Sequence, residues 1–107
     1  MKTTDMIDLG EVSQVPRGES RCFEIRSRRI AVFHLEDGEV RAIDDLCSHA
    51  EASLAAGEVD GACVVCPWHG AKFSLDTGEA MTAPATESVK VYEVLVESGR
   101  IRLHWTD

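Results

Sequence analysis

The sequence lacks any apolar run long enough to cross a membrane. Its longest runs, such as Ile30-Ala31-Val32-Phe33, fall far short of the roughly 20 residues that span a bilayer. Residues 1–8 contain one basic residue and no apolar stretch of signal length, so we expect no secretion signal. These absences predict a cytoplasmic protein, in which reducing conditions keep cysteines as thiols. The cysteines therefore suggest metal binding or catalysis before disulfides.

Basic charge is also scarce in this chain. Its 11 Lys and Arg residues face 19 Asp and Glu residues, which leaves a formal net charge of −8. Such an excess argues against nucleic acid and anionic membrane surfaces as partners and favours a basic docking partner. The basic residues are unevenly spread, because six of the eleven lie between Arg17 and Arg41.

No segment of convincing length has a helical pattern. The 107 residues correspond to one domain, with short Val-, Ile- and Phe-rich runs separated by turn dipeptides such as Asp37-Gly38 and Ser98-Gly99. These runs predict strands at residues 21–25, 29–35, 40–43, 89–96 and 100–105. The pattern is typical of an all-β, antiparallel β-sandwich or barrel.

The middle of the chain, residues 44–84, is rich in turn residues and holds only short predicted strands, at 62–65 and 72–75. We expect it to form a small loop-rich insertion, and loops held by a rigid scaffold commonly carry functional sites. The last strand alternates Ile101, Leu103 and Trp105 with polar residues, which predicts a half-buried edge strand.

Two short Cys and His pairs lie inside this middle section. Cys47-Ser48-His49 and Cys66-Pro67-Trp68-His69 are separated by sixteen residues. Two thiolates and two imidazoles could hold zinc or an iron–sulfur cluster. Zinc fingers usually group the two Cys on a hairpin and the two His on a helix, whereas here each pair is mixed and no helix is predicted. The mixed pairs favour a cluster with the sulfurs on one iron and the nitrogens on the other, and zinc remains the alternative.

This pattern resembles the Rieske signature, in which C-x-H and C-x-x-H are separated by a spacer of about this length. The flanking residues agree with it, and the whole chain is similar to a soluble Rieske ferredoxin of bacterial ring-hydroxylating oxygenases. The resemblance implies one Rieske domain over residues 1–107, with a cluster-binding subdomain over residues 45–85. It implies one 2Fe-2S cluster held by Cys47, His49, Cys66 and His69, covered by the proline loop Ala83-Pro84-Ala85.

By the same resemblance the chain is a one-electron carrier and not an enzyme. Its expected donor is an NAD(P)H-dependent flavoprotein reductase, and its acceptor is the terminal oxygenase of an aromatic-ring dioxygenase. We expect a monomer that docks transiently near His49 and His69. The alternatives are a Rieske subunit of another complex, such as a nitrite-reductase-like small subunit, or an accessory protein in iron–sulfur assembly or redox sensing.

The remaining Cys and His residues have structural interpretations. Cys63 forms a C-x-x-C with Cys66, but no helix start follows, so we expect it to fill the strand before the second pair. Cys22 is expected to be a small core residue. His34 is expected to be structural, and His104 to face solvent.

The resemblance also predicts a low redox potential. Respiratory Rieske proteins donate hydroxyl hydrogen bonds to the cluster from a Ser and a Tyr, and the matching positions here are Ala71 and Phe73. Hydrogen bonds to cluster sulfur stabilise the added electron, so their loss lowers the potential. We expect a value at the low end of the roughly −150 to +300 mV Rieske range.

Overall fold

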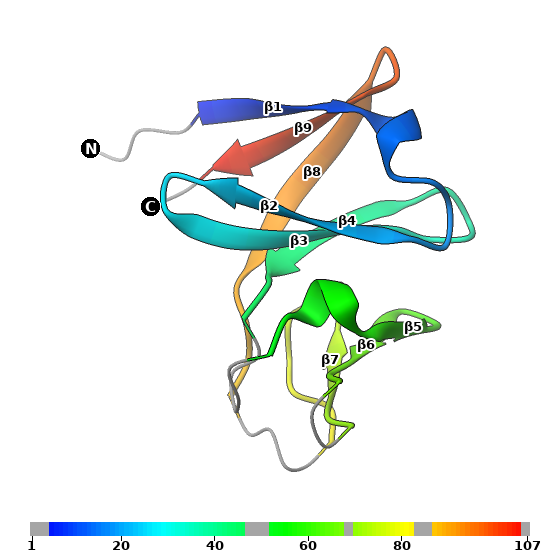
Figure 1. Ribbon diagram of the computed structural model, residues 1–107, viewed down its shortest axis with the longest axis vertical. Coiled ribbons are helices and arrows are strands. Elements are labelled where there is room, and N and C mark those ends of the chain that lie inside the picture. Colours follow the sequence, from blue (N-terminus) through cyan, green and yellow to red (C-terminus); the bar gives the residue numbers. More distant parts are fainter. Residues whose placement is uncertain (1–4, 47–51, 68–69, 83–86, 106–107) are drawn as a thin grey trace.

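The computed structural model describes residues 5–46, 52–67, 70–82 and 87–105, and these form two antiparallel sheets (Figure 1). The larger sheet has six strands in the order β1-β9-β8-β4-β3-β2, and the smaller has the order β5-β6-β7. Two short 3-10 helices, η1 (Val12–Gln14) and η2 (Leu54–Ala56), complete the described elements. The strands are β1 (Asp5–Glu11), β2 (Ser20–Ile25), β3 (Arg28–His34), β4 (Val40–Asp44), β5 (Glu58–Asp60), β6 (Cys63–Val65), β7 (Lys72–Ser74), β8 (Val91–Glu97) and β9 (Arg100–Trp105).

The larger sheet is curled, with β1 and β9 lying above β2 and β3 in the view of Figure 1. Its two halves are joined where β4 pairs with β8 over only two residue pairs, Ala42 with Tyr92 and Ile43 with Val91. The smaller sheet and η2 lie below it, formed by residues 54–74. The predicted all-β fold, with a small loop-rich unit inserted between strands of a larger one, is confirmed.

The sequence pattern missed two strands and misplaced one. Neither β1 nor the three-residue β5 was predicted, because both contain acidic residues in place of a regular apolar alternation. The prediction that residues 100–105 form an edge strand is wrong, since β9 lies between β1 and β8. The predicted alternation is nevertheless present, with Ile101, Leu103 and Trp105 buried.

Turns join the strands at both turn dipeptides that the sequence predicts. Gly38 lies between β3 and β4 with a φ of 93°, and Ser98-Gly99 joins β8 to β9 with φ values of 51° and 76°. A further turn, the two-residue Arg26-Ser27 between β2 and β3, also has positive φ at both residues although neither is glycine. Positive φ at both central residues matches the right-handed twist of a hairpin.

Strand β3 divides the protein interior into two apolar clusters. Ile30 and Val32 pack inside the curled sheet with residues such as Leu103. Ala31 and Phe33 point to the opposite face and pack against η2 and the smaller sheet. Because both faces of β3 are covered, this strand is a continuous apolar run and does not alternate with polar residues.

No helix within the described residues is long and apolar enough to span a membrane.

Candidate metal centre

Cys66 follows β6 and is the one predicted ligand that lies among the described residues. It is 1% exposed and packs in the apolar cluster that includes Leu54 and Phe73. Its backbone N–H donates to the carbonyl of Ala71 at 2.7 Å, which pairs the two flanks of the segment that contains His69. The side chain of Cys66 is thus held in a dry environment.

The residues that flank the first predicted cluster loop are paired with each other. Leu46 and Ser53 form an antiparallel bridge, and the N–H of Leu54 donates to the carbonyl of Asp45 at 2.7 Å. Leu54 belongs to the same apolar cluster as Cys66. The two ends of this loop are therefore held together, and Leu54 links them to the apolar cluster that contains Cys66.

The residues before the predicted proline loop lie next to the turn that follows Cys66. Met81 N–H donates to the carbonyl of Lys72 at 2.7 Å, and Lys72 N–H donates to the hydroxyl of Thr82 at 2.9 Å. Ala80 and Phe73 form a bridge one residue further along. The flanks of the second and third predicted cluster-loop segments consequently meet beside β7, and the first segment is linked to them through the apolar cluster that Leu54 shares with Cys66.

Three of the four predicted ligands, Cys47, His49 and His69, lie outside the described residues, as does the predicted loop at 83–85. In the parts of the chain that the structure describes, no three Cys, His, Asp or Glu side chains come together to hold a metal. The donor set still fits an iron–sulfur cluster, because the one described member is a buried cysteine in the apolar cluster that links these segments.

Two glycines allow the close packing that supports this end of the molecule. A side chain at Gly57 would collide with the carbonyl oxygen of Val65 on β6, so only glycine lets η2 approach the strand that leads to Cys66. Gly78 has a φ of 78°, and a side chain there would collide with the carbonyl oxygen of Val89. These contacts tie the smaller sheet to η2 and to the chain leading into β8.

Cys63 lies on β6 opposite Ser74 and is a free, half-buried thiol. Side chains on a strand alternate between its two faces. Val64 is fully buried, whereas Cys63 and Val65 are half-buried, so Cys63 extends on the less buried face of β6. Its predicted place in the strand is confirmed.

Cys22 departs from its prediction, whereas His34 agrees with it. Cys22 is half-buried and does not belong to either core cluster, since it lies next to the guanidinium of Arg29. Hydrogen bonding to the Cys22 sulfur and the charge of Asp45 raise the pKa of Arg29. His34 has its Nδ1 at 2.6 Å from the carbonyl oxygen of Val15, a structural contact.

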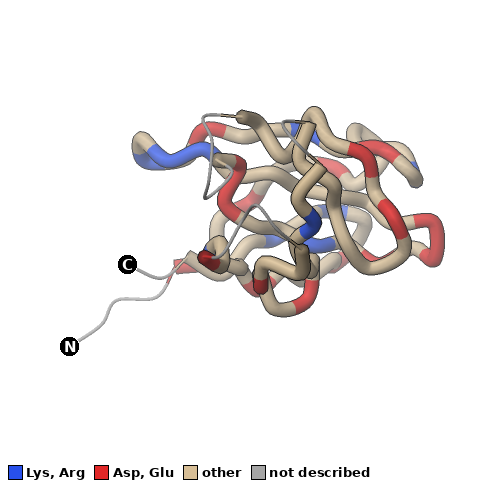
Figure 2. Tube along the Cα trace, turned by 90° about the horizontal axis from the view of Figure 1, so that it is seen from below, with Lys and Arg blue, Asp and Glu red and all other residues tan. Residues whose placement is uncertain are grey.

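The basic residues between Arg17 and Arg41 do not form a bare positive surface. Three of them form ion pairs with carboxylates: Arg26 with Asp5 at 2.8 Å, Arg29 with Asp45 at 3.0 Å, and Arg41 with Asp76 at 2.8 Å. Figure 2 shows acidic residues distributed over the molecule, with several along the side away from the two termini.

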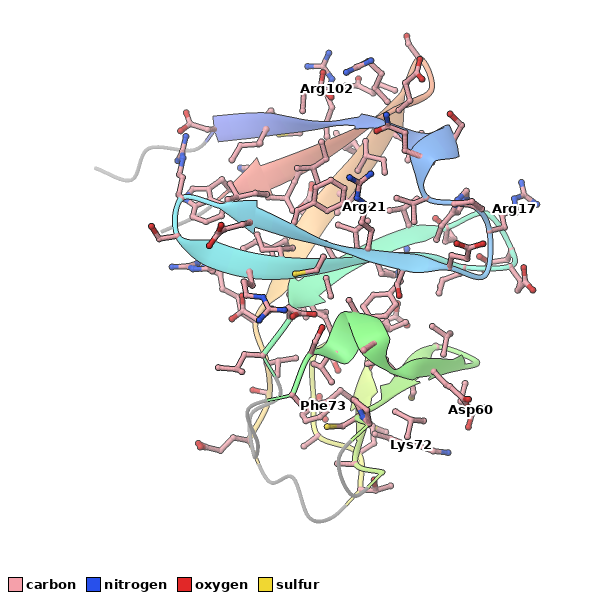
Figure 3. The ribbon with its side chains drawn as sticks, viewed as in Figure 1. Arg17, Arg21, Asp60, Lys72, Phe73 and Arg102 are labelled. Carbon is pink, nitrogen blue, oxygen red and sulfur yellow. The ribbon has the colours of Figure 1, made fainter. Side chains whose placement is uncertain are left out.

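One ion pair crosses the smaller sheet over its central strand β6 and joins the two outer strands, at the lower right of Figure 3. Lys72 Nζ of β7 lies 2.8 Å from a carboxylate oxygen of Asp60 on β5. Their hydrogen bond raises the pKa of Lys72 and lowers the pKa of Asp60. Phe73, the next residue on β7, is fully buried in the same cluster as Cys66.

Known proteins resemble this chain over most of its length. The Rieske [2Fe-2S] domain family matches residues 5–93. A 3-phenylpropionate/cinnamic acid dioxygenase ferredoxin subunit of Photorhabdus laumondii is 46% identical over 91 residues, covering 84% of this chain and 85% of the relative. The structure of a Sphingomonas yanoikuyae B1 ferredoxin superposes with a TM-score of 0.86 at 33% identity, covering 94% and 99% of the two chains. A chain in a complex of oxygenase and ferredoxin from carbazole 1,9a-dioxygenase superposes with a TM-score of 0.83 at 29% identity, covering 92% and 91%.

The curled sheet, the inserted three-stranded sheet and the buried cysteine at its loop-bearing end define a Rieske-type electron-transfer protein. The chain belongs to the Rieske [2Fe-2S] family, as a ferredoxin component of aromatic-ring dioxygenase systems. Its cofactor is a Rieske 2Fe-2S cluster, and it transfers electrons to an oxygenase without being catalytic itself. The predicted resemblance is thus confirmed, and the Rieske cluster replaces the zinc alternative.

Proposed function

We propose that Cys47 and Cys66 ligate one iron of the cluster and that His49 and His69 ligate the other. The support is that Cys66 is buried and its N–H donates to the carbonyl of Ala71, while the flanks of the segment containing Cys47 and His49 pair with each other and reach the same apolar cluster through Leu54. When bound, the cluster accepts and returns a single electron. The chain's own part is to exclude water around Cys66 and to hold the loops in register.

The same observations support one Rieske domain over residues 1–107 with a cluster-binding subdomain at 45–85. Phe33 and Ile43 of the larger sheet pack in the cluster that also contains Val64, Cys66 and Phe73 of the smaller unit. Because this apolar cluster is shared, the two units are expected to fold as one domain.

Substitution of single ligands tests the assignment. Cys66→Ala is expected to abolish the visible absorption of the cluster and the electron paramagnetic resonance signal of the dithionite-reduced protein. The matched control Cys63→Ser, three residues away on β6, is expected to retain both. Circular dichroism verifies that each variant is folded. A Cys66→Ala protein that keeps a normal Rieske signal would show that the ligand set is wrong.

The proposed donor is an NAD(P)H-dependent flavoprotein reductase, and the proposed acceptor is the terminal oxygenase, both docking transiently near His49 and His69. Two large apolar side chains support this surface, because Leu46 is 56% exposed and Met81 is 55% exposed at the flanks of the cluster loops. Small apolar contacts around an electron exit allow rapid association and release. The acidic excess favours basic residues around the partner's site.

The relative from Photorhabdus laumondii is named for a dioxygenase of 3-phenylpropionate and cinnamic acid. Its 46% identity supports an oxygenase partner that acts on an aromatic ring bearing a carboxylate side chain.

We further propose that this carrier is a cytoplasmic monomer. The free thiols of Cys22 and Cys63 support a reducing compartment, and size-exclusion chromatography tests the monomer.

Reconstituted electron flow tests the docking surface. With a reductase and oxygenase from the same source, Leu46→Asp is expected to lower kcat/KM for the ferredoxin by about tenfold, because a charge replaces an apolar contact. Leu95→Asp is the matched control, since Leu95 is 45% exposed but lies on β8 of the larger sheet. Equal loss in the two variants would contradict docking at the cluster end.

A further inference from the structure

Asp45 is the one charged side chain that is fully buried within the described residues. It is 1% exposed and precedes the predicted ligand Cys47 by two positions. A buried carboxylate is costly unless hydrogen bonds and an opposite charge compensate it. Its burial here calls for a specific role.

The carboxylate joins the two ends of the first cluster loop. Oδ1 of Asp45 accepts hydrogen bonds from the Ser53 hydroxyl and from the Ala55 N–H, both at 2.8 Å. The backbone of Asp45 adds a third link, because its carbonyl accepts from Leu54 N–H at 2.7 Å. We call Asp45, Ser53 and Ala55 the clasp.

The clasp is itself anchored to the larger sheet. Oδ2 of Asp45 lies 3.0 Å from Nη2 of Arg29 on β3. The two groups form an ion pair, although they are not aligned as a hydrogen bond. The N–H of Asp45 donates to the carbonyl of Arg29 at 3.0 Å. The Ser20 hydroxyl of β2 donates to the carbonyl of Ala55 at 2.6 Å. Both ends of the loop are thereby fixed to a rigid scaffold.

We propose that Asp45 is a positioning residue for the cluster, which closes the loop bearing Cys47 and His49 and places a fixed negative charge beside the cluster. This inference rests on the proposed ligand assignment. The Cα atoms of Asp45 and Cys47 are at most about 7.6 Å apart, since consecutive Cα atoms are separated by 3.8 Å. Arg29 is 58% exposed, so solvent weakens its compensation of the charge.

Two substitutions separate closure from charge. Asp45→Ala removes both hydrogen bonds of the clasp, and the cluster is expected to be lost about tenfold or more faster in the presence of a chelator. Asp45→Asn keeps an acceptor oxygen for Ser53 and Ala55, so cluster loss is expected to remain within about twofold of the wild type. Removing the negative charge should nevertheless raise the reduction potential of Asp45→Asn, whereas Arg29→Gln should lower it.

Asp44→Asn is the matched control. Asp44 precedes Asp45 and also carries a carboxylate, but that carboxylate accepts from the Tyr92 hydroxyl in place of the donors of the clasp. Its cluster lifetime is expected to equal that of the wild type. If Asp45 only supported the fold, its substitutions would change the stability of the protein, but the reduction potential of Asp45→Asn would equal that of the wild type.

Equal potentials and equal cluster lifetimes in Asp45→Asn, Asp45→Ala and the wild type would overturn the proposal. A separate variant tests the ligand assignment. A Cys47→Ser protein with an unchanged Rieske signal would show that the assignment is wrong, independently of the results for the Asp45 variants. The two failures are therefore distinguishable by resonance spectra and potentials alone, without an oxygenase assay.

Discussion

At the scale of single residues, Tyr92 has hydrogen-bonding and stacking partners at the junction between the two halves of the larger sheet. The Tyr92 hydroxyl donates to Asp44 at 2.6 Å and accepts from Arg28 at 3.1 Å, and its ring stacks on Trp105 with centroids 5.9 Å apart. Burial, followed by the hydrogen bond to Asp44, raises the pKa of Tyr92 to about 12. The neutral phenol is thus the form that the fold stabilises.

Tyr92 is the only tyrosine in the chain, so ultraviolet titration reports this residue alone. Because its pKa rises from 10.0 to about 12 on folding, its contribution to stability is complete below pH 10 and is lost as the pH rises through about 12. We expect tyrosinate absorbance in the native protein to develop around pH 12, and in the urea-unfolded chain around pH 10. Coincident titrations of the two states would contradict the buried hydrogen bond.

At the scale of elements, two hairpins of the larger sheet use the same turn with different residues. Arg26-Ser27 has φ values of 50° and 68°, and Ser98-Gly99 has 51° and 76°. Glycine adopts positive φ readily, whereas other residues are disfavoured by roughly 1–2 kcal/mol. The β2–β3 hairpin therefore forms against the preference of its turn residues, and strand packing must compensate for it.

Exchanging the second turn residue tests this balance. Ser27→Gly is expected to raise the free energy of unfolding by up to about 1 kcal/mol, and Gly99→Ser to lower it by a similar amount. A Cβ at position 99 would meet only open space, so backbone conformation alone accounts for the effect. Urea denaturation followed by tryptophan fluorescence gives both values. A destabilised Ser27→Gly protein would show that the serine side chain matters more than its backbone.

At the scale of the whole molecule, the two apolar clusters differ in what supports them. The apolar cluster within the curled sheet is formed by residues of long paired strands, including β8 and β9. The other cluster is covered by the smaller sheet, whose strands have three residues each. A three-residue strand contributes few ladder hydrogen bonds, so the smaller sheet is expected to depend on the cofactor for its stability.

Removal of the iron–sulfur cluster by a reductant and a chelator tests this dependence of the smaller sheet on its cofactor. Amide hydrogen exchange at Val64 of β6 is expected to accelerate about tenfold or more, while exchange at Leu103 of β9 remains nearly unchanged. The reason is that metal binding contributes directly to the folding free energy of the unit that supplies the ligands. Equal acceleration at both positions would contradict a particular dependence of the smaller sheet on the iron–sulfur cluster.

The sequence by itself determined the fold class, the cofactor and the main strands. Cys and His spacing reflects the chemistry of the cluster, and strand alternation reflects local burial, so both are readable from short segments. The position of β9 inside the sheet, the pairing of β1 and the Asp45 clasp were decided only in the tertiary structure. Each depends on contacts between distant residues, as when Ile7 pairs with Leu103 or Arg29 pairs with Asp45, and no local pattern encodes such a contact.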